Sequence, residues 1–185
     1  VSMVYAAMLI IALTAACPSL AVAEEIQLSA IEQLGRHLFF DKNLSDPQGQ
    51  SCAACHHPAA GWTGESPEVN AGESVYRGAR KERSGNRKPP SSAYATQSPV
   101  FYYDRKEGDF VGGSFWDGRA TGWLLGNPAA EQAQGPFVNP VEHNMRDAQT
   151  VVEKVCSSDY ASLFRQTYGN DICQNVINAY NAIGQ

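Results

Sequence analysis

One short motif constrains this chain more than any other feature: the pentapeptide Cys52-Ala53-Ala54-Cys55-His56. Its C-x-x-C-H pattern is the attachment pattern of c-type haem. Two thiols at this spacing can reach the two vinyl groups of one porphyrin, and the histidine that follows then lies under the iron as its proximal ligand. The motif therefore predicts one covalently attached haem c, held by both cysteines, with His56 as the metal ligand.

Two other chemistries use the same cysteine spacing. A thioredoxin-like redox pair needs a βαβ context, which the sequence lacks. A zinc site needs further cysteine or histidine ligands at close spacing, and His57 alone does not supply them. We therefore favour haem attachment over both alternatives.

The chain beyond the motif is partly helical and partly irregular. Ser29 and Glu32 form a capping box that predicts a helix over residues 29–40. Apolar residues recur at helical spacing in residues 147–166 and again in residues 172–183. Between these segments lies a long irregular stretch rich in Gly, Pro, Ser and Asn, which a compact domain seldom tolerates without a purpose. A cofactor that serves as the core would supply that purpose, and we predict neither a strand nor an internal repeat.

Composition narrows the class of function. The 185 residues carry 14 Lys and Arg against 19 Asp and Glu, so the net charge is −5. An acidic chain of this kind is not expected to bind nucleic acid. The 3 Trp, 8 Tyr and 7 Phe argue against a disordered chain, because they provide apolar surface for a folded core.

Residues 1–23 predict an export signal. They contain no charged residue, and an apolar core over residues 6–13 precedes the small-x-small cleavage pattern Ala21-Val22-Ala23. The stretch is short for a membrane span, which needs about 20 apolar residues. We therefore interpret this segment as a cleaved signal peptide.

Cleavage before Glu24 would leave a mature domain of residues 24–185 in the periplasm, with no membrane span. Export implies an oxidising compartment, where disulfides persist. A lipoprotein anchor at Cys17 is the alternative, although the residues before it match a lipoprotein signal poorly.

Cys156 and Cys173 lie between the predicted carboxy-terminal helices, on either side of residues 157–172. A disulfide between them would stabilise the fold by roughly 3 kcal/mol in the chain-entropy description. Two free buried thiols are the alternative, and we favour the disulfide.

Three ordered blocks of the chain resemble the bacterial di-haem cytochrome c peroxidase family, and the resemblance covers residues 31 to about 180. The blocks are residues 34–41 with 44–45 and 51–56, residues 115–120 (Phe-Trp-Asp-Gly-Arg-Ala), and residues 132–142 (Gln-Ala-Gln-Gly-Pro-Phe-Val-Asn-Pro-Val-Glu). The family also includes maturases that oxidise Trp residues of a partner protein, and the blocks alone do not separate the two activities.

The resemblance implies a role for each matching residue. His56 corresponds to the proximal ligand of the peroxidatic haem, Glu142 to the distal acid–base group, and Gln132 to the neighbouring pocket amide. Trp116 corresponds to the aromatic residue between the two haems, a candidate electron relay. Cleavage of peroxide needs a base that moves a proton from the near oxygen to the leaving one, which a carboxylate can do. Without the resemblance, Glu142 would be interpreted as a surface carboxylate.

Two neighbouring side chains keep open roles. Arg119 could pair with a haem propionate or brace its own turn. His143 could be a sixth haem ligand, a second acid–base group or a solvated side chain. We favour a solvated His143, because adjacent side chains in an extended turn usually point apart.

The chain departs from the family pattern at three places. Gly72 stands where many members carry a histidine that caps the resting haem, so we expect an open or water-bound distal face. Lys88 replaces an asparagine near the family's interdomain calcium, which leaves calcium uncertain. The second C-x-x-C-H of the family's carboxy-terminal haem domain does not occur in these residues, so either the sequence is a fragment or a truncated protein exists.

The resemblance implies an all-α, cytochrome c-like haem domain with short helices and long loops wrapped on the haem. Its expected function is that of an oxidoreductase, a peroxidase domain that reduces hydrogen peroxide with electrons from a small cytochrome c or cupredoxin. Its partner would be the missing second haem domain or a second copy. The alternatives are a mono-haem electron-transfer protein, with Met145 or His143 closing the iron, and a di-haem oxidase that modifies a partner protein.

Overall fold

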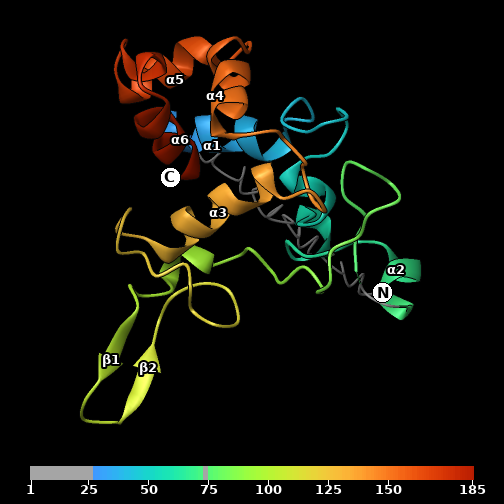
Figure 1. Ribbon diagram of the computed structural model, residues 1–185, viewed down its shortest axis with the longest axis vertical. Helices are drawn as coiled ribbons and strands as arrows, with labels where there is room; N and C mark the ends of the chain where they lie inside the picture. The colour runs from blue at the N-terminus through green and yellow to red at the C-terminus, as the bar shows by residue number, and fades with distance from the viewer. Residues whose placement is uncertain (1–26, 73–74) are drawn as a thin grey trace, which may run out of the picture.

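The computed structural model describes residues 27–72 and 75–185 (Figure 1). The predicted signal peptide and Cys17 lie outside the described residues. No helix within these two ranges is both long and apolar enough to cross a membrane.

The described part of the chain is helix-rich. Its six α-helices are α1 (Ala30–Phe40), α2 (Pro67–Ala71), α3 (Pro128–Val138), α4 (Ala148–Cys156), α5 (Ala161–Tyr168) and α6 (Val176–Gly184). Its four short 3-10 helices are η1 (Cys52–Ala54), η2 (Pro58–Ala60), η3 (Ala95–Gln97) and η4 (Ile172–Gln174). Only short elements interrupt residues 57–113, as their composition predicts.

The helix-rich architecture is broadly consistent with the all-α prediction, which does not include a small antiparallel hairpin of β1 (Tyr102–Asp104) and β2 (Asp109–Val111). It projects away from the helices at the lower end of the molecule in Figure 1. Each strand has three residues, which is too short for an alternating apolar pattern to be recognised in the sequence.

The hydrophobic core lies among helices α1, α4, α5 and α6, which gather at one end of the molecule (Figure 1). Fully buried side chains from α1, the loop after it, α4 and α5 meet there: Leu34, Leu44, Val151, Val155 and Phe164. The capping box predicted at the start of α1 is present, because Ser29 and Glu32 bond to each other's backbone N–H groups. This core anchors α1, and the haem motif follows α1 after one loop.

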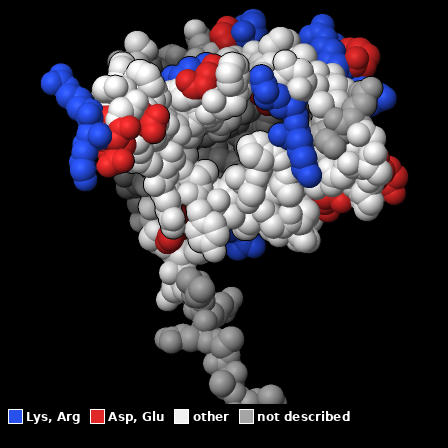
Figure 2. Space-filling model, turned by 90° about the horizontal axis from the view of Figure 1, so that it is seen from below, with Lys and Arg blue, Asp and Glu red and all other residues white. Residues whose placement is uncertain are grey.

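Charged side chains do not gather into a patch of one sign on the face shown in Figure 2. Acidic and basic residues are scattered around its rim, and basic side chains also lie beside a central hollow.

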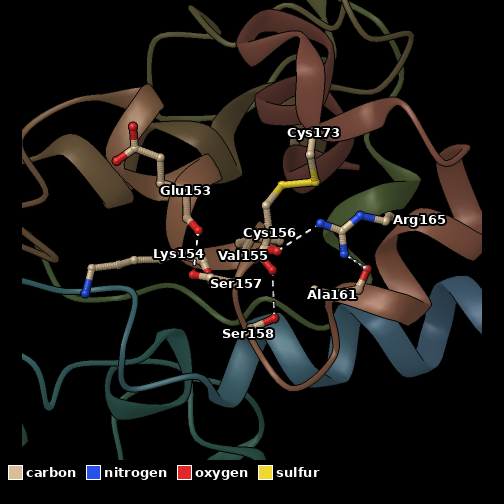
Figure 3. Close-up of a disulfide and its surroundings, with 9 residues drawn as sticks. All are labelled: Glu153, Lys154, Val155, Cys156, Ser157, Ser158, Ala161, Arg165 and Cys173. Atoms are coloured by element: carbon tan, nitrogen blue, oxygen red, sulfur yellow. Dashed lines mark hydrogen bonds between the residues drawn. A yellow bond between two sulfur atoms is a disulfide. The ribbon is translucent and has the colours of Figure 1, made fainter.

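The predicted helix over residues 147–166 is divided into α4 and α5 (Figure 3). The Ser157 hydroxyl donates to the carbonyl of Glu153 at 2.7 Å, and the Ser158 hydroxyl donates to the carbonyl of Val155 at 2.7 Å. Serine hydroxyls that bond to backbone carbonyls in this way compete with the helical ladder. They account for the end of α4.

Cys156 and Cys173 form a disulfide that joins the end of α4 to η4 (Figure 3). The predicted pairing is therefore confirmed. Arg165 adds a second connection, because its guanidinium donates to the carbonyls of Cys156 and Ala161 at 3.1 and 3.3 Å.

Replacing both cysteines, Cys156→Ser with Cys173→Ser, should lower the free energy of unfolding by about 3 kcal/mol, because the unfolded chain regains the entropy of the opened loop. Urea unfolding of the haem-loaded protein, followed by far-ultraviolet circular dichroism, measures the change. A double variant that unfolds at the wild-type urea concentration would contradict the prediction.

Candidate haem-binding site

The haem motif folds as one tight turn. Ser51 precedes η1, and the backbone N–H of His56 donates to the carbonyl of Cys52 at 2.9 Å. The amide of Gln50, a buried side chain, donates to the Cys55 sulfur at 3.4 Å. The turn therefore has a defined conformation in which both thiols and the imidazole are presented from consecutive positions.

Both motif thiols are free and protonated. Burial raises the pKa of Cys52 to about 12 and the pKa of Cys55 to about 11. Thiol–disulfide oxidoreductases instead lower the pKa of a C-x-x-C cysteine so that the thiolate can attack. The electrostatics of this site therefore disfavour the redox-pair alternative and leave two thiols available for thioether bonds.

The imidazole of His56 is oriented as a haem ligand requires. Its Nδ1 lies 2.9 Å from the carbonyl oxygen of Pro90 and 3.2 Å from that of Trp62. Carbonyl oxygens only accept hydrogen bonds, so Nδ1 carries the proton and Nε2 keeps its lone pair for a metal. The residues present therefore fit a covalently bound haem with His56 Nε2 as the iron ligand.

Glu142 lies in the turn that follows α3, close to the haem motif. Its Oε2 accepts a hydrogen bond from the Asn139 amide at 2.9 Å. Burial raises the pKa of Glu142, while the Asn139 hydrogen bond and the charge of His56 act in the opposite direction. The carboxylate in turn raises the pKa of both motif thiols. The fold thus brings Glu142 within electrostatic reach of residues far away in the sequence.

Residues 77–83 lie against the Glu142 turn and hydrogen-bond to its backbone carbonyls. The backbone N–H of Ala79 donates to the Glu142 carbonyl at 2.7 Å, and the Arg83 guanidinium donates to the Pro140 carbonyl at 3.4 Å. Gly78 is required at this crossing, because a Cβ there would lie 2.6 Å from the Glu142 carbonyl oxygen.

The structure gives fewer contacts between the haem motif and the other two predicted catalytic residues, Gln132 and Trp116. Gln132 is half-buried on α3, the helix that leads into the Glu142 turn. Trp116 is 73% exposed, and the Arg87 guanidinium lies 4.9 Å from its ring centroid. No contact described for the structure joins Trp116 to Glu142 or His56.

Arg119 braces its own turn. Its Nη1 donates to both carboxylate oxygens of Asp117, at 2.8 and 2.9 Å. Its guanidinium also lies 3.7 Å from the centre of the Phe115 ring. Of the two roles left open for Arg119, the structure displays the bracing one, and propionate binding stays a prediction.

His143 is not solvated, which corrects the sequence-based expectation. Only 4% of the residue is exposed, and its Nδ1 donates to the Leu44 carbonyl at 2.7 Å. Its ring packs edge-on against Phe137, and burial lowers its pKa, so the imidazole is neutral. Met145 is buried in the same core. The turn after Glu142 therefore points back into the helices.

An open cavity of about 1370 Å³ lies elsewhere, between α1 and the α4–α5 connection. Within it His37 stacks on Tyr160, and the Tyr160 hydroxyl donates to Asp41 at 2.6 Å. Tyr160 and Asp41 satisfy each other, and the haem motif does not line the cavity. In the described ranges, His, Cys, Asp and Glu side chains form no cluster of three that could hold a metal ion.

Sequence reasoning missed two contributors to this site. The carbonyl of Pro90, 34 residues after His56 in the sequence, orients the imidazole. No residue near the motif indicates this contact. Asn139 lies within the third block of the resemblance, between the predicted residues Gln132 and Glu142. The signal that was available is the Asn-Pro pair, since Asn side chains commonly bond to backbone groups in turns.

Comparisons with known proteins agree on one family. The family profile described as di-haem cytochrome c peroxidase matches residues 29–185. The chain is 33% identical over 171 residues to methylamine utilization protein MauG of Paracoccus denitrificans, covering 91% of this chain and 42% of that protein. It is 32% identical over 138 residues to cytochrome c551 peroxidase of Pseudomonas aeruginosa, covering 74% of this chain and 32% of that protein.

A solved structure is also similar. The diheme peroxidase BthA from Burkholderia thailandensis superposes with a TM-score of 0.74 and 29% sequence identity. The match covers 85% of this chain and 37% of that one. The chain therefore spans about two fifths, or less, of the length of these relatives.

Proposed function

This chain belongs to the di-haem cytochrome c peroxidase family, and from that membership we propose that residues 24–185 form a haem c domain of an oxidoreductase that reduces hydrogen peroxide. Each turnover would take two electrons and two protons and release two molecules of water. A small cytochrome c or cupredoxin would supply the electrons, and a second haem domain or a second copy would complete the electron path.

The observation that carries this proposal is the half-buried Glu142 beside the haem motif. When bound by Cys52, Cys55 and His56, the haem would supply the redox chemistry, while the protein supplies position and proton transfer. Asn139 occupies Oε2 of Glu142, so Oε1 is the oxygen free to exchange a proton. It would take the proton from the near oxygen of peroxide and return it to the leaving oxygen, while the Gln132 amide orients the substrate.

The proposed location is the periplasm. The predicted signal over residues 1–23 supports export, and the Cys156–Cys173 disulfide suits an oxidising compartment. Cytochrome maturation after export would then attach the haem.

Two alternative functions stay as further candidates. An electron carrier with a closed iron would need His143 or Met145 as sixth ligand, and both are buried in the helical core. Oxidation of a partner protein is the second candidate, because the family resemblance includes maturases of that kind and the chain is similar to methylamine utilization protein MauG. Genes next to this one that encode such a substrate protein would support it over peroxide reduction.

The direct test mixes haem-loaded protein with hydrogen peroxide in a stopped-flow instrument and follows the Soret band. We expect a spectral change whose rate increases in proportion to peroxide concentration. This assay observes the haem of this chain without requiring a second one. A Soret band that does not respond to peroxide would contradict the proposal.

The ferric haem should be largely high-spin. Gly72 stands where a capping histidine would be, and the alternative ligands His143 and Met145 are held in the core. Electron paramagnetic resonance of the isolated haem-loaded protein measures the spin state. A purely low-spin spectrum would show that a protein side chain closes the distal face.

A further inference from the structure

The turn that carries Glu142 is organised around one residue, Asn139. Its backbone carbonyl accepts hydrogen bonds from the N–H groups of Glu142 and Asn144, at 3.0 and 2.9 Å. Its own N–H donates to the Pro136 carbonyl at 3.3 Å, at the end of α3. Main-chain bonds that do not involve the Asn139 side chain therefore close the turn.

The side chain of Asn139 makes two further bonds. Its Oδ1 accepts from the backbone N–H of Val141 at 3.2 Å, and its Nδ2 donates to Oε2 of Glu142 at 2.9 Å. The first bond holds the amide in a fixed orientation within the turn. Nδ2 is therefore aimed at one particular carboxylate oxygen.

A glutamate side chain has several rotatable bonds, and it reacts efficiently only when its carboxylate is held in place. Asn139 supplies the hydrogen bond described for the Glu142 carboxylate. We propose that Asn139 is a positioning residue, which holds Oε2 of Glu142 and thereby presents Oε1 to the substrate. This inference rests on the proposed function, because it gives Glu142 its orientation for proton transfer.

The same bond also bears on the protonation state of Glu142. Burial raises the pKa of this carboxyl group, and the Asn139 amide opposes that rise by favouring the ionised form. A positioned and ionised carboxylate is what a general base requires.

The chain offers a matched control in the same turn. The Asn144 amide Nδ2 donates to the Asp46 carbonyl at 2.7 Å, and its Oδ1 accepts from Arg83 at 3.2 Å. Asn144→Asp therefore makes the same chemical change as Asn139→Asp. It keeps the acceptor to Arg83 and does not alter the bond to Glu142.

The experiment compares haem-loaded wild type, Asn139→Asp, Asn144→Asp, Glu142→Gln and the double variant Asn139→Asp/Glu142→Gln. Asn139→Asp keeps the acceptor for Val141 and removes the donor to Glu142. We expect it to slow the peroxide reaction on the order of 10- to 100-fold. In the Glu142→Gln background the same change should alter the rate by less than about twofold, because the two residues act as a unit.

A second readout does not depend on turnover. Hydrogen cyanide must lose its proton as it binds ferric haem, so its association rate reports on the distal base. We expect Asn139→Asp and Glu142→Gln to slow cyanide association, and Asn144→Asp to match the wild type. Haem content and the thermal melting temperature verify that each variant folds. If Asn139→Asp does not mature, Asn139→Ser tests the same bond, because its hydroxyl is too short to reach Glu142.

The outcomes distinguish a failure of the positioning role of Asn139 from a failure of the proposed function. Slow Glu142→Gln with wild-type rates for Asn139→Asp overturns the positioning role and leaves the proposed function standing. An equal loss from Asn139→Asp with and without Glu142 also overturns it, since the effect would then not pass through the carboxylate. Wild-type rates for Glu142→Gln overturn the proposed function itself.

Discussion

Glu142→Gln is expected to slow the reaction of the haem-loaded protein with hydrogen peroxide by about 10²–10⁴-fold, the usual contribution of a positioned general acid–base group. Glutamine keeps the size of the side chain and can still bond to Asn139, but it cannot accept the proton of the near peroxide oxygen. Haem content and the resting Soret spectrum should stay unchanged, because Glu142 does not hold the cofactor.

Stopped-flow mixing at the Soret band measures this effect. Glu153→Gln is the matched control, since Glu153 lies on α4 and its carboxylate accepts a hydrogen bond from the exposed side chain of Gln149. Gln132→Ala should reduce the rate less than Glu142→Gln, because it removes an orienting amide and leaves the base. Should Glu142→Gln react as fast as the wild type with an intact spectrum, the electron-transfer alternative becomes the better interpretation.

Removal of both motif thiols, Cys52→Ala with Cys55→Ala, should abolish covalent haem attachment. Thioether bonds from these cysteines are the predicted covalent links, and both side chains are free in the structure. Each single variant should retain less haem than the wild type. His56→Ala should keep the thioethers and lose the proximal ligand, which would change the spectrum of the attached haem.

A denaturing gel stained for haem peroxidase activity tests attachment, with material matured in a host competent for c-type cytochromes. The matched control is Cys156→Ser with Cys173→Ser, which removes two cysteines away from the motif and should keep its stained band. A wild-type lane without a band, or a stained band from the double motif variant, would refute the prediction.

Local features of this protein could be predicted from the sequence because their causes lie within a few residues. The capping box of Ser29 and Glu32 starts α1 as predicted. Cys52, Cys55 and His56 form one turn because they are sequence neighbours. Two boundaries of the carboxy-terminal helices were harder to predict, since polar side chains set them. The Ser157 and Ser158 hydroxyls end α4, and the Asn175 side chain caps α6 after η4.

The hairpin could not be predicted, since cross-strand contacts hold it together. Phe101 and Phe110 stack with their ring centroids 5.4 Å apart, and Tyr103 lies 5.0 Å from Phe110. Those pairs exist only once the two strands are side by side.

Three features of the candidate site depend on the tertiary structure: the burial of His143, the placement of Glu142 and the tautomer of His56. His143 is buried rather than solvated because its imidazole bonds to the Leu44 carbonyl, from the loop after α1, and its ring packs against Phe137. Glu142 is held because Ala79 and its neighbours cross the turn from a distant segment. The proton of His56 is placed on Nδ1 by the carbonyl of Pro90. A sequence shows which groups are adjacent along the chain. The burial, pKa and hydrogen-bond partners of those groups depend on which remote segment the fold lays against them.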